Sequence, residues 1–315
     1  MSWVFIPGLV QDNRKLLDKD PGYRAALFRA TAGNPALRAA WLMGDWNALS
    51  GAFFQNYAAW KDAGGVLHPF RIPSHWGRFL AMDYGSARPF CVLWVAVAPA
   101  SCMTHRGITI PEGSLVVYRE WYGAATDERG ELMPDVGIKM PATEIGLQIG
   151  RLSKFEPRRK WSVIDPSAFK EEGGPSVATR ILEGERASGV EISPWYPADN
   201  ARVNDGGHIG GWDRVRELMG DARTLATERP RLYVFETCRH VLRTLPMMVH
   251  DPNRPEDMLK KGKEDHAVDT LRYAVMAEYG NFDPSSRKRE SSYREPTIGD
   301  LFQEVGIVSS SGRVL

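Results

Sequence analysis

Cysteine is scarce in this chain. Only Cys91, Cys102 and Cys238 occur among 315 residues, and no two of them form a Cys-x-x-Cys pair. An odd number of cysteines without such a pair argues against a structural zinc site and against a disulfide framework. The cysteine content instead indicates a protein of a reducing compartment.

Long hydrophobic runs and a strong charge of one sign are missing as well. The longest apolar run, residues 90–98, has about half the length that spans a bilayer and is better explained as a buried strand. The chain does not begin with the charged and then apolar stretch of a signal peptide. The net charge of +1 gives no overall attraction to nucleic acid or membrane, so such binding requires local patches. We therefore expect no membrane partner.

A phosphate-binding loop of the Gly-x-x-x-x-Gly-Lys-Ser/Thr type is also lacking. The glycine pairs at 64–65, 173–174 and 206–207 are not followed by Lys-Ser or Lys-Thr. Such loops hold the phosphates of ATP in many motor proteins. This polypeptide is therefore not expected to hydrolyse ATP.

The residues that are present have the pattern of a soluble α/β protein. Hydrophobic residues make up 43% and charged residues 25% of the chain, as in ordinary globular domains. Short apolar runs that end at turns predict strands, and helical periodicity predicts the helices between them. The strands are expected at 79–83, 90–98, 115–122, 161–165, near Val190 and at 232–235, and the helices at 143–154, 176–187, 212–219, 237–249 with a break at Pro246, and from 265 onward. Strands alternating with helices predict a mixed central sheet flanked by helices.

Composition divides the chain into three parts. Residues 1–75 are rich in Trp, Gly, Asn and Pro, and the aromatic residues at 53–60 require a surface to pack on, so this part is predicted to be a linker or docking segment. Residues 76–280 form the α/β domain, in which the turn-rich stretch 99–114 is read as a surface insertion. Residues 281–315 carry basic residues among Ser, Glu and Pro and are predicted to be a flexible tail.

Three acidic residues stand at positions that suggest one site. Asp83 and Asp165 each close an apolar strand, and the carboxyl ends of strands are where α/β sheets bind ligands. Asp269 and His266 are three residues apart on a predicted helix and share the face opposite its apolar stripe. Each acid alone has a simpler explanation as a turn or cap residue. The three together favour a carboxylate cluster.

A carboxylate cluster predicts a bound cation. Carboxylates that lie close together repel one another, and a fold that gathers three of them usually neutralises them with a metal ion. Oxygen ligands without cysteine favour Mg²⁺ or Mn²⁺. Two such ions about 4 Å apart can activate a water and stabilise the leaving oxygen of a phosphodiester. The acids therefore indicate metal-dependent phosphodiester hydrolysis.

These residues resemble a known family, the nuclease part of the large terminase subunit of tailed bacteriophages, which cuts concatemeric DNA for packaging. The stretch Asp265-His266-Ala267-Val268-Asp269-Thr270-Leu271-Arg272-Tyr273 is the most specific match, and Asp83-Tyr84-Gly85 and Val163-Ile164-Asp165-Pro166-Ser167-Ala168 match the two strand ends. The stretch that joins ATPase to nuclease is matched by Phe5-Ile6-Pro7, Asp12-Asn13, Trp41-Leu42-Met43-Gly44-Asp45-Trp46 and Gly51-Ala52-Phe53-Phe54. The resemblance covers residues 3–278.

The resemblance implies an RNase H-like fold and an endonuclease in the host cytoplasm. It makes Asp83, Asp165 and Asp269 the metal-binding acids, with His266 beside them as a supporting or proton-handling group; Asp265 is a weaker candidate, since helix starts favour Asp as a cap. It also implies double-stranded DNA, the portal protein and the small terminase subunit as partners. Because the phosphate loop is lacking, the ATPase motor would lie on another chain or have been removed, and this chain would not translocate DNA.

Local basic residues are candidates for DNA contact. Arg151, Lys154, Arg158, Arg159 and Lys160 precede the Asp165 strand and could bring positive charge next to the acids, although a solvated basic loop explains them equally well. Contacts of this kind are made to phosphates and tolerate any sequence. A second basic run, Lys260, Lys261 and Lys263, precedes His266, and Glu120 ends the third strand as an auxiliary acid or, more simply, a structural one.

Two alternative functions remain open from the sequence. Another RNase H-like enzyme, such as a junction resolvase or an integrase, would use the same acids, but the residues 1–60 argue against it. A DNA-docking or regulatory module whose acid site is idle without its motor would also carry them. Intact Asp83, Asp165 and Asp269 favour a working site.

Overall fold

The computed structural model describes residues 10–24, 52–171, 173–191, 193–251, 253–259 and 264–280. Near the N-terminus it contains a 3-10 turn, Val10–Asp12, and a short helix α1, Arg14–Lys19, whose cap Asn13 accepts a hydrogen bond from the Leu16 amide. The predicted helices at 20–29 and 35–43 fall wholly or mostly outside the described residues, and the predicted tail 281–315 lies entirely outside them.

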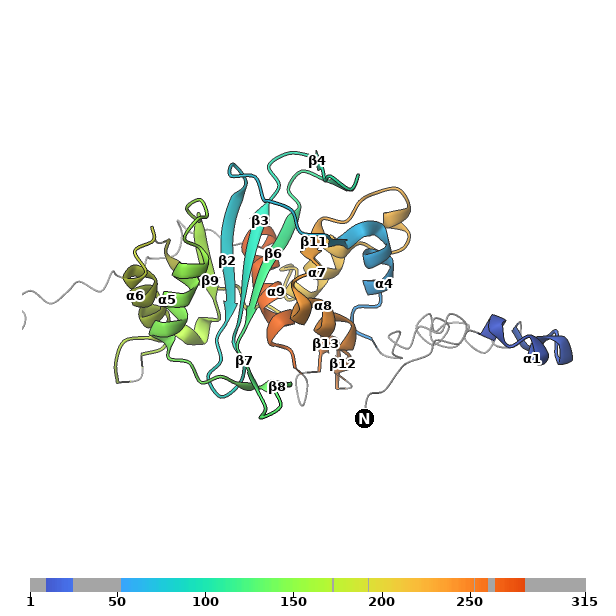
Figure 1. Ribbon diagram of the computed structural model, residues 1–315. Coiled ribbons are helices and arrows are strands. Elements are labelled where there is room, and N and C mark those ends of the chain that lie inside the picture. Colours follow the sequence, from blue (N-terminus) through green and yellow to red (C-terminus); the bar gives the residue numbers. More distant parts are fainter. Residues whose placement is uncertain are drawn as a thin grey trace, which may run out of the picture. The chain divides into compact units, whose positions relative to one another are not determined.

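A seven-stranded sheet forms the centre of the fold (Figure 1). Its spatial order is β1-β11-β6-β3-β2-β9-β10. The strands are β1 (Val66–Leu67), β2 (Gly77–Asp83), β3 (Cys91–Val97), β6 (Leu115–Tyr122), β9 (Trp161–Ile164), β10 (Trp195–Pro197) and β11 (Leu232–Phe235). Strand β3 runs antiparallel to both of its neighbours, β2 and β6, and every other pair is parallel.

This order is that of the RNase H-like fold expected from the sequence. When β2, β3, β6, β9 and β10 are counted as first to fifth, their spatial order is 3-2-1-4-5 with the second strand reversed. Strands β1 and β11 extend the sheet beyond β6. The parallel strands β2, β9 and β6 therefore end at the same edge of the sheet, and we call this edge the carboxyl edge.

Helices cover both faces of the sheet. On one face lie α5 (Ala142–Leu152) and α6 (Val177–Ala187), and on the other lie α9 (His266–Tyr279), α7 (Gly211–Met219) and α8 (Arg239–Thr244) (Figure 1). Because both faces are covered, β3 is apolar along its whole length and reads as a continuous run rather than an alternating one. Helices α5 and α6 approach closely because of their glycines: a Cβ at Gly146 would lie 2.0 Å from the Ile181 carbonyl oxygen.

Helix α9 differs from the surface helix that its sequence predicts. Its residues from Ala267 to Ala277 are all buried, including Asp269 and Arg272. The helix therefore lacks a solvated face and lies between the sheet and its neighbours α7 and α8 (Figure 1). Its polar side chains point to partners inside the protein, as described below.

Residues 52–67 belong to the core of the domain, whereas the sequence suggested a separate segment up to residue 75. Phe53 makes an edge-to-face contact with Trp212, with ring centroids 5.8 Å apart. The buried indole of Trp60 donates a hydrogen bond to the Leu232 carbonyl oxygen (2.8 Å). Helix α4 (Tyr57–Trp60) and a π-helical turn (Lys61–Gly65) lead into β1, which pairs with β11 and so completes the sheet.

Three small hairpins decorate the sheet. The insertion at 99–114 contains β4 (Cys102–Met103) and β5 (Thr109–Ile110). At the carboxyl edge, β6 leads into β7 (Ala124–Thr126) and β8 (Leu132–Gly137), and β12 (His250–Asp251) pairs with β13 (Arg254–Met258) before α9.

The remaining segments show two shifts from the predicted elements. The strand expected near Val190 is found at β10, and the helix expected over 237–249 ends at Thr244 and continues as the 3-10 turn Leu245–Met247. Further 3-10 turns are Pro166–Phe169 and Thr224–Ala226. None of the helices in the described ranges is long and apolar enough to span a membrane.

Candidate active site

Asp83 and Asp165 lie at the ends of neighbouring parallel strands. The register of β2 and β9 pairs Met82 with Ile164, so the next residue of each chain segment is an aspartate. The Asp165 amide donates to the Met82 carbonyl oxygen (3.1 Å), which carries the strand pairing up to the acid. The Asp165 carboxylate also caps the 3-10 turn that follows, accepting from the Ser167 amide (2.8 Å). The two strands therefore place two carboxylates side by side at the carboxyl edge.

Helix α9 contacts both acids. His266 Nδ1 and Asp83 Oδ2 are 2.9 Å apart, and the Tyr273 hydroxyl donates to Asp165 Oδ2 at 2.5 Å. His266 and Tyr273 are seven residues apart and therefore share one face of the helix. The sequence identified His266 but not Tyr273, although this seven-residue spacing would have pointed to it.

Asp269 is held by two arginines. Arg202 Nη1 donates to its Oδ1 at 3.1 Å, and Arg272, one turn further along α9, donates through Nε at 3.1 Å. Arg272 is completely buried, whereas the Arg202 guanidinium also binds Asp257 and stacks on Trp212, 4.8 Å from the ring centroid. The Asp269 charge is thus neutralised by protein cations, a feature that the sequence did not suggest.

The electrostatics distinguish the two strand-end acids. Burial raises the pKa of Asp83 to about 6; the hydrogen bond from His266 lowers it, and the charges of Asp269 and Asp165 raise it further. For Asp165, burial raises the pKa, but hydrogen bonds from Ser167 and Tyr273 outweigh it and the pKa is lowered overall. The influence of Asp269 and Asp165 on Asp83 shows that the three acids sense one another's charge.

His266 shows the complementary effect. Burial lowers its pKa, but the hydrogen bond with Asp83 and the charge of that carboxylate outweigh burial, so the pKa of His266 is raised. A raised histidine pKa and a shared hydrogen bond favour an imidazole that donates to Asp83. His266 thereby fixes the orientation of the Asp83 carboxylate.

The donor set fits a hard divalent cation only in part. Asp83 and Asp165 offer carboxylate oxygens at adjacent strand ends, and the raised pKa of Asp83 reflects negative charge that protein groups leave incompletely offset. Asp269, in contrast, already binds Arg202 and Arg272. Within the described ranges, no three His, Cys, Asp or Glu side chains are placed to ligate one ion together. The three-acid metal site therefore stays a prediction.

Glu120 serves the fold at the same edge. Its two carboxylate oxygens accept hydrogen bonds from the His240 and Val241 amides, at 2.9 and 2.7 Å, at the start of α8. Burial raises its pKa to about 7, although these two bonds lower it. Its observed contacts are those of a helix cap, in agreement with the structural alternative.

The basic residues before β9 lie away from the acids. Lys160 immediately precedes β9 and Asp165 follows it, so the strand carries the chain across the sheet, roughly 16 Å for five residues at about 3.3 Å each. Arg159 is buried in an ion pair with Glu185 (2.8 Å), and Arg158 pairs with Glu191 (2.7 Å). The sequence placed this cluster beside the acids, but the structure places it toward the opposite edge and leaves Arg159 inaccessible to DNA.

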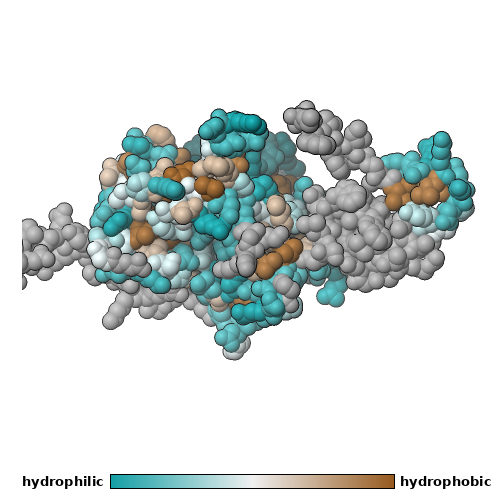
Figure 2. Space-filling model, turned by 90° about the horizontal axis from the view of Figure 1, so that it is seen from below, coloured by the Kyte–Doolittle hydropathy of each residue, from teal (hydrophilic) through white to brown (hydrophobic). Residues whose placement is uncertain are grey.

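Two members of the predicted basic sets keep an open position, and one set lies outside the structure's ranges. Arg151 and Lys154 are exposed at the end of α5. Lys260, Lys261 and Lys263 fall outside the described residues. Where residues are coloured in Figure 2, which looks at the molecule from the end where β6 leads into β7, hydrophilic residues predominate and hydrophobic ones form small separate areas. This end offers a polar surface.

Comparison with known proteins gives matches among solved structures. Neither a protein-family profile nor a curated protein matches the chain. The nuclease domain of the P22 large terminase is 18% identical, with 67% of this chain and 87% of that chain covered and a TM-score of 0.42. The large terminase of a thermophilic bacteriophage is 16% identical, with 67% of this chain covered and a TM-score of 0.43; the chain spans only 41% of that protein.

A third similar structure contains a metal. The large terminase nuclease of the thermophilic phage G20c with bound magnesium is 10% identical, with 72% of this chain and 97% of that chain covered and a TM-score of 0.40. The same nuclease has been solved with bound cobalt. In fold, the chain described here is similar to the nuclease domains of phage large terminases.

Proposed function

We propose that this chain is a metal-dependent nuclease that cleaves double-stranded DNA during viral genome packaging. The observation that carries the proposal is the placement of Asp83 and Asp165 at neighbouring ends of β2 and β9, each bonded to a side chain of α9. The motif residues that resemble terminases thus come together at one edge of an RNase H-like sheet. A structural role alone does not require two acids at that edge with opposite shifts of their pKa.

Each residue has a proposed task. Asp83 and Asp165 would hold Mg²⁺ or Mn²⁺, with Asp269 as the third acid. The ions, two in this proposal, would supply a nucleophilic water at neutral pH and stabilise the leaving oxygen. His266 orients the Asp83 carboxylate through the 2.9 Å contact. Tyr273 holds one oxygen of Asp165 and the Ser167 amide holds the other, so that this carboxylate keeps one orientation.

A second candidate function follows from the state of Asp269. Because Arg202 and Arg272 already neutralise this carboxylate, the chain could instead be a DNA-docking module whose acid site is idle. In that case DNA would bind without being cut. The two functions differ in whether a metal recruits Asp269.

The packaging context rests on the resemblance alone. It supplies the portal protein and the small terminase subunit as partners, and a motor ATPase on another chain. The lack of a phosphate loop in this sequence leads us to propose that cleavage proceeds without ATP. A junction resolvase or integrase would use the same acids but would require a branched or recombining substrate.

Cleavage of supercoiled plasmid tests the proposal. We expect nicking or linearisation with Mg²⁺ or Mn²⁺, no requirement for ATP and little sequence preference. Asp165→Asn should lower the rate by at least about 100-fold, the effect of removing a group essential for transition-state stabilisation. Asp62→Asn, a change at an exposed acid in the turn before β1, is the matched control and should keep full activity. Cleavage that survives EDTA would refute the metal mechanism, and DNA binding without cleavage would favour the docking module.

A further inference from the structure

A cavity on the opposite side of the sheet has the features of a second binding site. It has a volume of about 840 Å³ and lies among the loop before β2, strand β6 and the turn after α5. In β2 the side chains of Leu80 and Met82 belong to the core beneath α5 and α6, whereas Phe79 and Ala81 belong to the core beneath α9. Arg78, which lines the cavity, alternates with Leu80 and Met82, and Asp83 alternates with the other set. The cavity is therefore distinct from the candidate active site.

The floor of the cavity is a fixed ionic cluster. Glu156 accepts a hydrogen bond from the Tyr118 hydroxyl (2.5 Å) and pairs with Arg119 (2.8 Å) and Arg78 (3.5 Å). Arg78 also donates to the Ile72 carbonyl oxygen (2.8 Å), which ties the loop before β2 to the sheet. Two guanidiniums against one carboxylate leave the floor positive. The walls are thus held in place before any ligand arrives.

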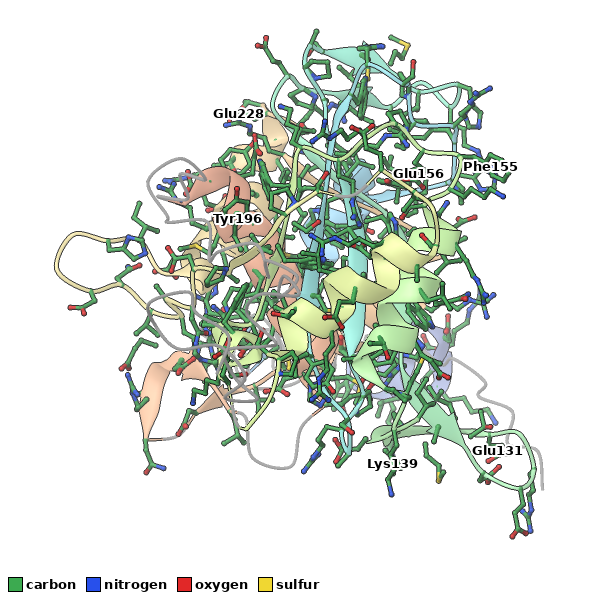
Figure 3. The ribbon with its side chains drawn as sticks, turned by 90° about the vertical axis from the view of Figure 1, so that its left-hand side faces the viewer. Glu131, Lys139, Phe155, Glu156, Tyr196 and Glu228 are labelled. Atoms are coloured by element: carbon green, nitrogen blue, oxygen red, sulfur yellow. The ribbon has the colours of Figure 1, made fainter. Side chains whose placement is uncertain are left out.

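The rim carries an exposed aromatic ring between free cations. The Phe155 side chain is 93% exposed, the largest exposed fraction among the large hydrophobic residues of the described ranges. In Figure 3 Phe155 lies at the periphery of the molecule, toward the end opposite Lys139, and Glu156 lies further inward. Lys154 Nζ lies 5.7 Å from the centroid of the Phe155 ring, and Arg71 is exposed across the cavity. Neither of these cations has an acidic partner within the described residues.

We propose that this cavity binds a nucleotide unit, with its base stacked on Phe155 and its phosphate between Arg71 and Lys154. Exposure of a whole phenyl ring is costly in water, and a planar base can cover it whatever its sequence. A positive floor and two unpaired cations at the rim match a phosphate. The volume suits a nucleotide, since pockets for small ligands measure about 300–1,000 Å³. A protein segment would instead be expected to bring acidic residues to a mainly apolar surface.

The nucleotide unit can come from two sources that share this chemistry, a single strand of DNA or a free nucleotide. The test is fluorescence anisotropy of the full chain with a labelled short oligothymidylate, in EDTA so that no nuclease activity intervenes, followed by competition with thymidine monophosphate. Competition at an equal nucleotide concentration identifies the free nucleotide as the ligand. Displacement only by unlabelled oligothymidylate identifies the strand. Either result supports the site.

Variants assign the binding to this cavity. Phe155→Ala should weaken binding about tenfold, as for the loss of one base–aromatic stack, and Phe155→Tyr should retain it. Arg71→Glu and Lys154→Glu should each weaken binding and reduce its salt dependence. Arg129→Glu, which makes the same charge change at an exposed residue in the turn between β7 and β8, is the control and should bind normally.

Three results would overturn the proposal. These are the absence of oligothymidylate and nucleotide binding by the full chain, equal binding by Phe155→Ala, and equal weakening by Arg129→Glu and Arg71→Glu. Ultraviolet cross-linking of the oligothymidylate gives a direct check, because the cross-link should map to the peptide that contains Phe155. All of these readouts are independent of plasmid cleavage, so the site and the proposed nuclease can fail separately.

Discussion

Replacing Asp83 by asparagine should stabilise the protein while removing its response to metal. Asp83 is the strand-end acid whose pKa is raised, by burial first and by the charges of Asp269 and Asp165 in addition. The neutral amide of asparagine has nearly the same shape and can still accept a hydrogen bond from His266. The substitution therefore removes a buried charge with little change in packing.

The magnitude follows from the raised pKa. The change from 3.8 to about 6 corresponds to about 3 kcal/mol at about 1.4 kcal/mol per pH unit. A weaker hydrogen bond to His266 offsets about 1 kcal/mol of this. At pH 7.5 the free energy of unfolding of Asp83→Asn should thus exceed that of the native protein by about 1–3 kcal/mol. This equals several degrees in Tm, at about 2–4 °C per kcal/mol for domains of about 150–250 residues.

The pH dependence has a definite sign. An acid whose folded-state pKa is raised costs stability once it ionises in the folded protein, and it costs nothing when both states are protonated. The advantage of Asp83→Asn should therefore be absent below about pH 4, grow between about pH 4 and pH 6, and be complete above about pH 6, the window set by the two values for Asp83.

Thermal unfolding in EDTA from pH 4 to pH 8 measures this effect, with Asp62→Asn as the control for the loss of an exposed acid. Addition of Mn²⁺ should then stabilise the native protein, because an ion that binds only the folded state raises its Tm, and should stabilise Asp83→Asn much less. If Asp83→Asn in EDTA at pH 7.5 is no more stable than the native protein, the buried charge at this strand end is not the cost that we infer.

Two further predictions concern the fold. Arg159→Ala should lower the free energy of unfolding by about 3–5 kcal/mol, because it leaves the buried carboxylate of Glu185 unpaired, whereas Arg158→Ala, at an exposed pair, should change it by less than about 1 kcal/mol; equal effects in denaturant titrations would contradict the assignment. Trp60→Ala should cost about 3–5 kcal/mol, since its buried indole packs in the core and bonds to Leu232. A small effect in the same titration would restore residues 52–67 to the separate segment suggested by the sequence.

Much of the sheet and the position of two acids could be predicted because they rest on local patterns. The apolar runs before Asp83 and Asp165 mark strands, and a strand that ends in an acid places it at the sheet edge. The helical periodicity of 212–219 and of the stretch after 265 was sufficient for α7 and α9. Local pattern thus supplied both the scaffold and its strand-end acids.

The contacts of Asp269 could not be predicted in this way. Arg202 comes from an irregular loop between β10 and α7 and carries no periodic signal, and only the folded chain brings it to α9. The burial of α9 on all sides had the same origin, because the helices that cover it are distant in sequence. Contacts between segments far apart in the chain decide these features.

The basic cluster shows a different limit. Residues 158–160 stand next to Asp165 in the sequence, but a strand separates them and carries the chain from one edge of the sheet to the other. The shift of the predicted strand from Val190 to β10 has a related cause, since pairing of Trp195–Pro197 with Ser162–Ile164, rather than local apolar content, selects the edge strand.

The central claim is that Asp83, Asp165 and Asp269 hold a divalent cation, and anomalous scattering from crystals soaked in Mn²⁺ tests it most directly. Our account predicts a peak between the carboxylates of Asp83 and Asp165, with Asp269 turned toward it and away from Arg202. A soaked crystal without a peak at the ends of β2 and β9, in which Asp269 still binds both Arg202 and Arg272 as it does here, would contradict it.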